Sequence, residues 1–210
     1  MDIDNIVKLL HNDYITHKVE HSESIDFMEN IHNPYLVLIC CILSLRTNDK
    51  TTIKAARNML KIADTPDKMM KVDVLSNAIY PVGFYKNKAS QIIELSCELV
   101  EKYSSKVPSE IEELIKFRGV GRKTANLVLT KGFNKPAICV DVHVHRITNR
   151  LGYVKTKTPD ETEMELRKIL PQKYWIDFNT LLVTHGQNIC KPQKPKCSEC
   201  SISKYCKKII

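Results

Sequence analysis

The sequence predicts an all-α fold, because apolar residues recur at helical spacing along most of the chain and alternating strand patterns are scarce. A third observation is the turn Gly119-Val120-Gly121 between two apolar segments, which is typical of a tight connection between helices. With 210 residues, 43% of them hydrophobic and 27% charged, the chain has room for one ordinary domain or two small ones with a real core.

Two adjoining helices are predicted first. Residues 35–47 and 50–63 are rich in apolar side chains, and the polar pair Asn48-Asp49 between them favours a short connection. The clearest helix covers residues 86–103. Its apolar face holds Ala89, Ile92, Ile93, Leu99 and Val100, and its polar face holds Lys88, Glu94, Glu98 and Lys102.

The next helix is predicted to start at Ser109, which is a suitable N-cap with Glu112 at the capping-box position. Residues 114–129, LIKFRGVGRKTANLVL, then predict one helix that stops at the Gly-Val-Gly turn and a second that begins directly after it. The last long helix is expected over residues 175–188 and leads into a cysteine-rich tail.

The charge of the chain favours a polyanionic partner. Its 32 Lys and Arg residues against 24 Asp and Glu give a formal net charge of +8, which suits nucleic acid first of all. The longest apolar run, Leu36–Leu43, is far shorter than the roughly 20 residues that span a bilayer, so no membrane partner is expected. The amino terminus is acidic where a signal peptide is basic, so we expect a reducing, cytoplasmic location.

Eight cysteines in such a compartment indicate metal or redox chemistry more often than disulfides. Four lie in or beside apolar segments and are expected to be buried as small hydrophobic residues. These are Cys40, Cys41, Cys97 and Cys139. The other four crowd into the last 21 residues, separated by six, two and five residues, and indicate a metal site. These are Cys190, Cys197, Cys200 and Cys206.

The Gly-Val-Gly turn is a candidate helix-hairpin-helix. Gly119 and Gly121 can adopt positive φ and allow the backbone to approach a ligand closely. The helix start behind them offers unpaired N–H groups and the positive end of the helix dipole, and Arg122 adds charge, which together favour a phosphate. The alternative is a purely structural connection with glycine as a C-cap.

Two residues have possible chemistry. Lys123 lies at that helix start beside Arg122, where neighbouring charge and partial desolvation disfavour an ammonium, and a neutral amine is a Schiff-base nucleophile. The alternative, which the residues alone favour, is one more phosphate-binding cation. Asp141 is placed to cap the helix VHVHRITNRL, and its carboxylate can also stabilise positive charge in a cleft.

These motifs together resemble the helix-hairpin-helix-GPD DNA glycosylases. The resemblance rests on residues 114–129, on the Gly132…Pro136…Asp141 segment with VDVHVHR, and on the Cys-x6-Cys-x2-Cys-x5-Cys tail. It extends over nearly the whole chain, since LSLRTNDKTTIKAA near residue 50 and VGFYKNKA at residues 82–89 occur in the family order.

The resemblance implies a two-domain, all-α DNA glycosylase fold. A central six-helix bundle with the hairpin is expected over residues 27–135, and residues 1–26 and 136–210 are expected to form a terminal domain with an iron–sulfur cluster loop. Its four cysteines would hold a [4Fe–4S] cluster as thiolates. Zinc also accepts four thiolates, but the spacing matches this family and differs from the paired CxxC of a zinc ribbon.

The resemblance also implies the activity, a bifunctional DNA glycosylase and AP lyase of base excision repair. The expected partner is double-stranded DNA with damaged bases or abasic sites, bound by a monomer. Oxidised or damaged pyrimidines would be removed through a Schiff base on Lys123, assisted by Asp141, with β-elimination 3′ to the abasic site. The chain ends four residues after Cys206, so an added adenine-specific domain is not expected. A non-catalytic DNA-binding protein and a monofunctional glycosylase are the alternatives.

The remaining expected DNA contacts come from three places. Phe84 occupies the family's position for an apolar wedge, although an ordinary core aromatic is the alternative. Arg46 stands where bacterial relatives carry a glutamine facing the DNA, which leaves its contact with the opposite base open. The hairpin itself would bind the DNA backbone through Gly119, Val120, Gly121 and Arg122.

Overall fold

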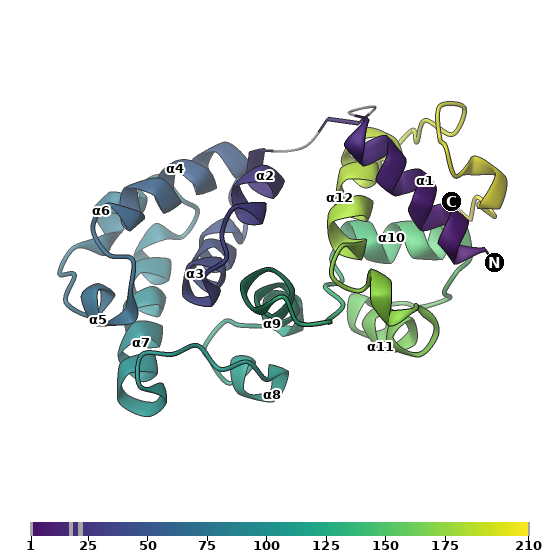
Figure 1. The fold of residues 1–210 in the computed structure, drawn as a ribbon. Helices are drawn as coiled ribbons and strands as arrows, with labels where there is room; N and C mark the ends of the chain where they lie inside the picture. Colours follow the sequence, from purple (N-terminus) through teal and green to yellow (C-terminus); the bar gives the residue numbers. More distant parts are fainter. Residues whose placement is uncertain (1, 17–18, 21–22, 210) are drawn as a thin grey trace. The chain divides into compact units, whose positions relative to one another are not determined.

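The computed structural model describes residues 2–16, 19–20 and 23–209, and these form helices and loops without any strand (Figure 1). The predicted all-α class is confirmed. The chain divides into two compact units, unit 1 with residues 1–22 and 136–210 and unit 2 with residues 23–135. Over the described part of the chain, no helix has the length and apolar character needed to cross a membrane.

Unit 2 is built around one buried helix. Its helices are α2 (Glu23–Glu29), α3 (Pro34–Ser44), α4 (Asp49–Leu60), α5 (Pro66–Met69), α6 (Leu75–Ile79), α7 (Tyr85–Tyr103), α8 (Ile111–Leu114) and α9 (Arg122–Leu127), with a π-helical turn η1 (Val128–Gly132) directly after α9. Every side chain from Val37 to Leu43 in α3 is buried, because α4, α7, α9 and η1 pack around it. Since α2 packs against α4, unit 2 begins at residue 23 instead of the predicted 27.

Side-chain caps start the two helices predicted first. The Asn33 side chain accepts from backbone N–H groups at the start of α3, and that of Asn48 accepts from Thr51 N at 3.0 Å in α4. Helix α3 ends at Ser44, before the predicted residue 47, because the chain turns sharply at Arg46, whose φ is +52°.

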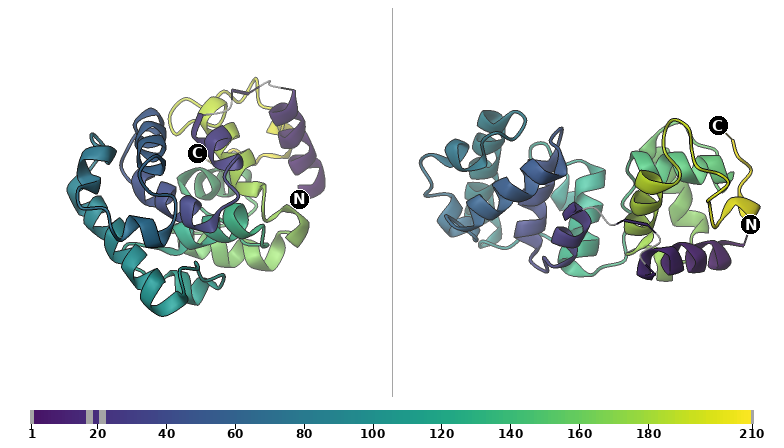
Figure 2. Two further views of the ribbon diagram at one scale, coloured as in Figure 1. Left: turned by 60° about the vertical axis from the view of Figure 1, so that its left-hand side comes forward. Right: turned by 90° about the horizontal axis from the view of Figure 1, so that it is seen from above.

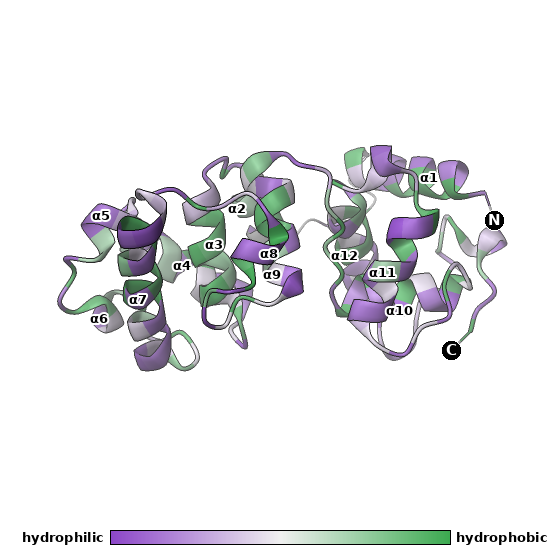
Figure 3. Cartoon of the chain, turned by 90° about the horizontal axis from the view of Figure 1, so that it is seen from below, coloured by the Kyte–Doolittle hydropathy of each residue, from purple (hydrophilic) through white to green (hydrophobic). Residues whose placement is uncertain are grey.

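Helix α7 covers the predicted range and begins one residue earlier, with hydrophilic and hydrophobic bands along its length (Figure 3). The prediction that Lys88 belongs to its polar face is wrong, since this residue is only 5% exposed. The last carbonyl groups of a helix have no partner within that helix. Lys88 Nζ donates to two carbonyls where α3 ends, Leu43 O at 2.9 Å and Leu45 O at 2.5 Å.

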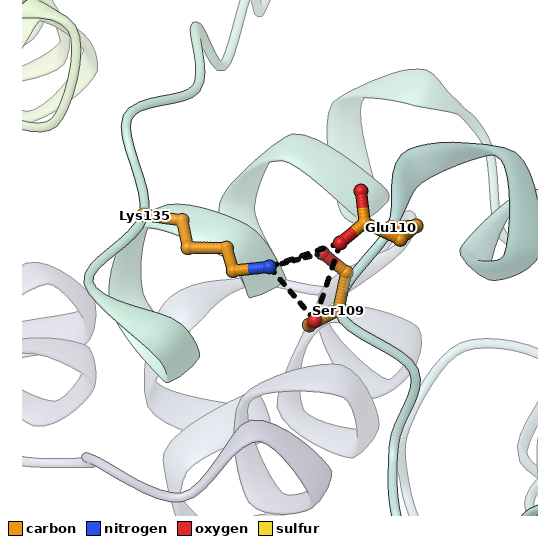
Figure 4. Close-up of polar contacts among 3 residues, drawn as sticks. All are labelled: Ser109, Glu110 and Lys135. Atoms are coloured by element: carbon orange, nitrogen blue, oxygen red, sulfur yellow. Dashed lines mark hydrogen bonds and ion pairs between the residues drawn. The ribbon is translucent and has the colours of Figure 1, made fainter.

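The predicted N-cap at Ser109 is also wrong. Helix α8 begins at Ile111 with Glu110 at its N-cap position and without a side-chain cap. The oxygens of Ser109 are bound elsewhere, because Lys135 Nζ donates to Ser109 O at 3.0 Å and Ser109 Oγ at 2.8 Å (Figure 4). The same ammonium reaches Glu110 Oε1 at 3.0 Å and so ties the entry of α8 to the end of unit 2.

Three of the four cysteines expected in the core are buried, as predicted. Cys40 and Cys41 lie in α3, and Cys139 lies in the segment that leads to the next helix of unit 1. Cys97 is only half-buried, because it lies beside the buried stripe of α7 and not within it.

Unit 1 is formed by both ends of the chain. Its helices are α1 (Ile3–Ile15), α10 (Val142–Leu151), α11 (Pro159–Ile169) and α12 (Phe178–Asn188), with 3-10 turns η2 (Gln172–Tyr174) and η3 (Ser203–Tyr205). Purple α1 lies beside the yellow-green C-terminal segments in Figure 2, and its Ile6 and Leu10 share one core with Val144 and Leu182. Helix α12 starts three residues after the predicted Trp175.

Candidate functional site

The hairpin between α8 and α9 is anchored on α7. Phe117 is 2% exposed and packs against Tyr103 with ring centroids 5.5 Å apart. Gly119 has a φ of +73°, as predicted, and a Cβ there would lie 2.4 Å from Gln91 Nε2. Because Gln91 Nε2 also donates to Arg118 O at 2.6 Å, a Cβ at position 119 would displace Gln91 from this bond, and the positive φ already disfavours any residue with a side chain.

Gly121 differs from this prediction, because its φ of −92° is ordinary for any residue. It is the N-cap of α9 and is exposed, and a Cβ there would have no neighbour within 4 Å. Nothing in unit 2 therefore requires a glycine at this position. The missing side chain leaves bare backbone at a helix start, where N–H groups lack partners within the helix. The Val120 side chain is buried, so only its backbone can contact DNA.

Lys123 is the second residue of α9, as predicted, and its side chain is exposed. The next two residues, Thr124 and Ala125, are buried and pack α9 against the rest of unit 2. Burial raises the pKa of the Cys41 thiol in α3 to about 12, and the nearby charge of Lys123 opposes this rise. The Lys123 amine therefore lies near α3 and is accessible to solvent.

Asp141 lies in unit 1 and caps α10, as predicted. Its Oδ1 accepts from His143 N and from Val144 N, both at 2.9 Å. Both cap bonds use the same oxygen, so the cap does not use Oδ2. The carboxylate can therefore hold the helix start and face a ligand at once.

The basic side chains that follow Asp141 serve the structure of unit 1. His145 Nδ1 lies 2.7 Å from Thr162 Oγ1, and Arg146 donates to Cys190 O at 2.8 Å. His143 Nδ1 lies 3.1 Å from the same guanidinium. All three side chains therefore have contacts within unit 1 that hold its helices and the start of the cysteine tail together.

The four cysteines of the tail line one cavity in unit 1. They lie around it together with apolar side chains of Ile147, Leu151, Ile189 and Ile202. Within the described ranges, no three His, Cys, Asp or Glu side chains converge to hold a single metal ion. Four thiols that line one cavity supply the all-thiolate donor set that holds a [4Fe–4S] cluster.

Donors to sulfur support the same fit. Lys208 N donates to Cys206 Sγ at 3.3 Å, and Arg150 Nη1 donates to Cys190 Sγ at 3.5 Å. Hydrogen bonds of this kind stabilise thiolate ligands. Burial raises the pKa of the Cys200 thiol to about 11. Sequence reasoning missed Arg150, because nothing in the helical pattern of α10 distinguishes it.

Arg46 and Phe84 form an exposed and strained pair on unit 2. Both have left-handed backbone conformations, with φ of +52° and +57°, which cost roughly 1–2 kcal/mol each for residues with a side chain. Phe84 is 60% exposed, so the core-aromatic alternative is wrong. The Arg46 guanidinium lies 5.8 Å from the centre of the Phe84 ring. Strain retained at exposed residues is typical of functional sites.

The chain is similar to known DNA repair proteins. Residues 39–172 match the HhH-GPD superfamily base excision DNA repair protein model, and residues 190–206 match the iron–sulfur binding domain of endonuclease III. Endonuclease III of Thermotoga maritima is 49% identical over 176 residues, which cover 83% of each chain.

Two solved structures support the likeness. A non-covalent endonuclease III–DNA complex and a trapped endonuclease III–DNA covalent intermediate each have a TM-score of 0.82 and 32% identity. Each covers 99% of this chain, and this chain covers 96% and 97% of theirs.

The chain belongs to the HhH-GPD superfamily of base excision DNA repair proteins and, within it, to the endonuclease III family. Enzymes of this family act as DNA glycosylases and AP lyases, so the chain is an enzyme and the alternative of a non-catalytic DNA-binding protein is excluded. Its cofactor is a [4Fe–4S] cluster.

Proposed function

We propose that this enzyme removes oxidised or otherwise damaged pyrimidines from double-stranded DNA through a covalent bond to Lys123. The observation that carries the proposal is the position of Lys123, exposed at the second residue of α9 and directly behind the hairpin. An amine there meets the sugar of a nucleotide whose phosphates lie on the hairpin. The trapped covalent intermediate of endonuclease III with DNA supports a covalent course.

Base removal and strand cleavage follow from one nucleophile. The Lys123 amine in its neutral form has the lone pair that a nucleophile needs. The amine attacks the anomeric carbon, the glycosidic bond breaks, and its electron pair leaves with the base. Loss of a proton from nitrogen and opening of the sugar ring give an imine. The protonated imine acidifies the neighbouring C2′ proton, and its removal breaks the C3′–O bond, whose electrons leave on the phosphate oxygen.

Asp141 is the carboxylate that assists this course. Since Oδ1 holds the cap of α10, we assign the chemical role to Oδ2. It stabilises the cationic character of the sugar as the base departs and moves protons during the exchange.

DNA contacts are assigned to three places on unit 2. The hairpin residues Gly119–Arg122 bind phosphates through the Arg122 guanidinium and through backbone N–H groups other than that of Val120, which donates to Phe117 O at 3.0 Å. Phe84 fills the gap that an extruded nucleotide leaves in the stack, and Arg46 faces the opposite base. Both side chains are exposed and both residues have left-handed backbone conformations, which supports this assignment.

Cys190, Cys197, Cys200 and Cys206 are assigned as the thiolate ligands of the cluster, because all four line one cavity within the matched iron–sulfur domain. The cluster stabilises unit 1 and takes no part in the steps at the sugar.

We also assign the enzyme to the cytoplasm, in association with the nucleoid. We assign it as a monomer, since one chain supplies every residue of the proposed site. Sedimentation at 24.1 kDa tests the last point.

Borohydride trapping tests the assignment of Lys123. Reduction of the imine on lesion-bearing duplex gives a stable covalent adduct, which Lys123→Ala is expected to lose together with strand cleavage. Lys68→Ala, which removes an exposed ammonium paired with Asp64, serves as the control and keeps both. An undiminished adduct with Lys123→Ala contradicts the proposal. Release of free base with an intact strand by the wild-type enzyme identifies a monofunctional glycosylase instead.

A further inference from the structure

A buried lysine lies beneath the exposed pair Arg46 and Phe84. Lys88 belongs to the first turn of α7 and is 5% exposed. Its Nζ donates to three oxygens, Leu43 O at 2.9 Å, Leu45 O at 2.5 Å and Thr47 Oγ1 at 3.1 Å. An ammonium has three N–H donors and no acceptor, so these oxygens match it completely. Burial lowers the pKa of Lys88 to about 8, which still leaves it mostly charged at neutral pH.

The acceptors lie on both sides of Arg46 in the sequence. Leu45 and Thr47 are its direct neighbours, and both are tied to the same nitrogen. Arg46 therefore forms the apex of a loop whose two sides converge on Lys88, and this convergence accompanies its φ of +52°. Because the ammonium binds from within unit 2, the Arg46 side chain remains on the surface.

The same network reaches the segment that carries Phe84. Gly83 N donates to Thr47 Oγ1 at 3.1 Å, and a Cβ at Gly83 would lie 2.7 Å from Arg46 O. The two loops are thus in backbone contact. Phe84 follows at once with its left-handed φ of +57°, and its carbonyl accepts from Lys88 N at 3.0 Å in the first turn of α7.

We propose that Lys88 is a positioning residue for base extrusion. It holds Arg46 and Phe84 in the left-handed backbone conformations from which their side chains enter the DNA stack. The inference rests on the proposed function of those two side chains. A wedge that is already formed needs no ordering when it meets DNA, so its binding energy is available to open the stack. Lys88 acts through the two loops and touches neither DNA nor the reacting atoms.

Lys88→Met tests this inference, because methionine keeps the apolar stem and removes all three donors. Lys102→Met is the matched control, since Lys102 lies exposed on the same helix and pairs only with Glu98 at 2.8 Å among the ion pairs described. Two single-turnover rates are compared. One is base extrusion in a duplex with a damaged pyrimidine, followed by 2-aminopurine fluorescence beside the lesion. The other is borohydride adduct formation on single-stranded abasic DNA, which has no stack to open.

Lys88→Met is expected to slow extrusion by about tenfold or more, since small displacements of positioned groups have effects of this order. Adduct formation on single-stranded DNA is expected to change less than about threefold, and Lys102→Met is expected to leave both rates unchanged. Phe84→Ala gives the same pattern as Lys88→Met. The double variant Lys88→Met/Phe84→Ala is expected to be slower than Phe84→Ala alone by less than the full effect of Lys88→Met, because Phe84→Ala already removes part of what Lys88 positions.

Thr47→Val keeps the test decisive where Lys88→Met does not fold. It removes the hydroxyl that joins Lys88 to Gly83, leaves the carbonyl contacts in place, and is expected to slow extrusion selectively. Equal losses on both substrates in folded variants indicate a general structural role and overturn the inference. Normal extrusion in Lys88→Met or Thr47→Val, with slow extrusion in Phe84→Ala, refutes the positioning role of Lys88 and leaves the wedge role of Phe84 intact. Normal extrusion in Phe84→Ala refutes the wedge and the inference together.

Discussion

Asp141 combines a structural task with a chemical one, and a single substitution separates them. Asp141→Asn retains an oxygen that can accept from His143 N and Val144 N, and asparagine equals aspartate as an N-cap. The free energy of unfolding is expected to stay within about 0.5 kcal/mol of the wild-type value. Base release is expected to slow by about 100-fold, because the negative charge at the sugar is lost. Denaturant unfolding and single-turnover kinetics measure the two effects.

Asp141→Ala is the companion variant. It removes the cap as well as the charge, and is expected to lower the free energy of unfolding by about 1 kcal/mol more than Asp141→Asn does. Activity at the wild-type level in Asp141→Asn, with stability lost only in Asp141→Ala, would reduce Asp141 to a helix cap and withdraw it from the chemistry.

At the scale of the element, the hairpin turn restricts which residues fit at position 119 but not at position 121. Gly119→Ala puts a methyl group 2.4 Å from Gln91 Nε2 at a φ of +73°, so it is expected to destabilise the protein by roughly 1–2 kcal/mol. Gly121→Ala meets nothing within 4 Å at an ordinary φ and is expected to leave the melting temperature unchanged. It is expected to weaken DNA binding, because its methyl group stands on the backbone that phosphate approaches.

Thermal unfolding and fluorescence anisotropy with lesion-bearing duplex measure these effects. The pair of variants contains its own control, because each changes a glycine to alanine in the same turn. Wild-type affinity in Gly121→Ala would show that bound DNA does not come close to this backbone, and the hairpin would then be a structural connection only.

Elements that depend on neighbours in the sequence were predictable. Asp141 caps N–H groups two and three residues ahead, and α9 begins directly after the hairpin, as local rules require. The errors have distant causes. Lys88 satisfies carbonyls 43 and 45 residues away, and Ser109 is bound by Lys135 from 26 residues further along. A helical pattern carries no information on such partners, so it placed Lys88 on the polar face.

At the scale of the whole molecule, the sequence was sufficient for the family, because its signature motifs are short and contiguous. The hairpin lies in unit 2, while Asp141 and the cysteine tail lie in unit 1, and each motif could be recognised without knowledge of the other unit. The strained conformations of Arg46 and Phe84 could not be predicted, because neither residue type favours a positive φ. What holds them is packing within unit 2, which no contiguous motif records.

Removal of the cluster is expected to loosen unit 1 and spare unit 2. The core of unit 1 packs against Cys190, Cys200 and Cys206, whereas the core of unit 2 is built around α3. Metal binding of this kind contributes directly to folding stability. Cys197 is not among the cysteines packed on that core, so Cys197→Ala removes a proposed ligand with little direct loss of packing.

Hydrogen–deuterium exchange read by mass spectrometry distinguishes the two units. In Cys197→Ala we expect loss of absorbance at about 400 nm and faster exchange in α10 and α12, with α3 and α7 still protected, because local opening follows the contacts that are lost. Cys97→Ala, which changes a half-buried cysteine of α7, is the control and should keep both the absorbance and the protection. Equal acceleration in α3 and α10 would mean that the cluster stabilises the whole molecule cooperatively, and protection unchanged in α10 would mean that it is not a structural part of unit 1.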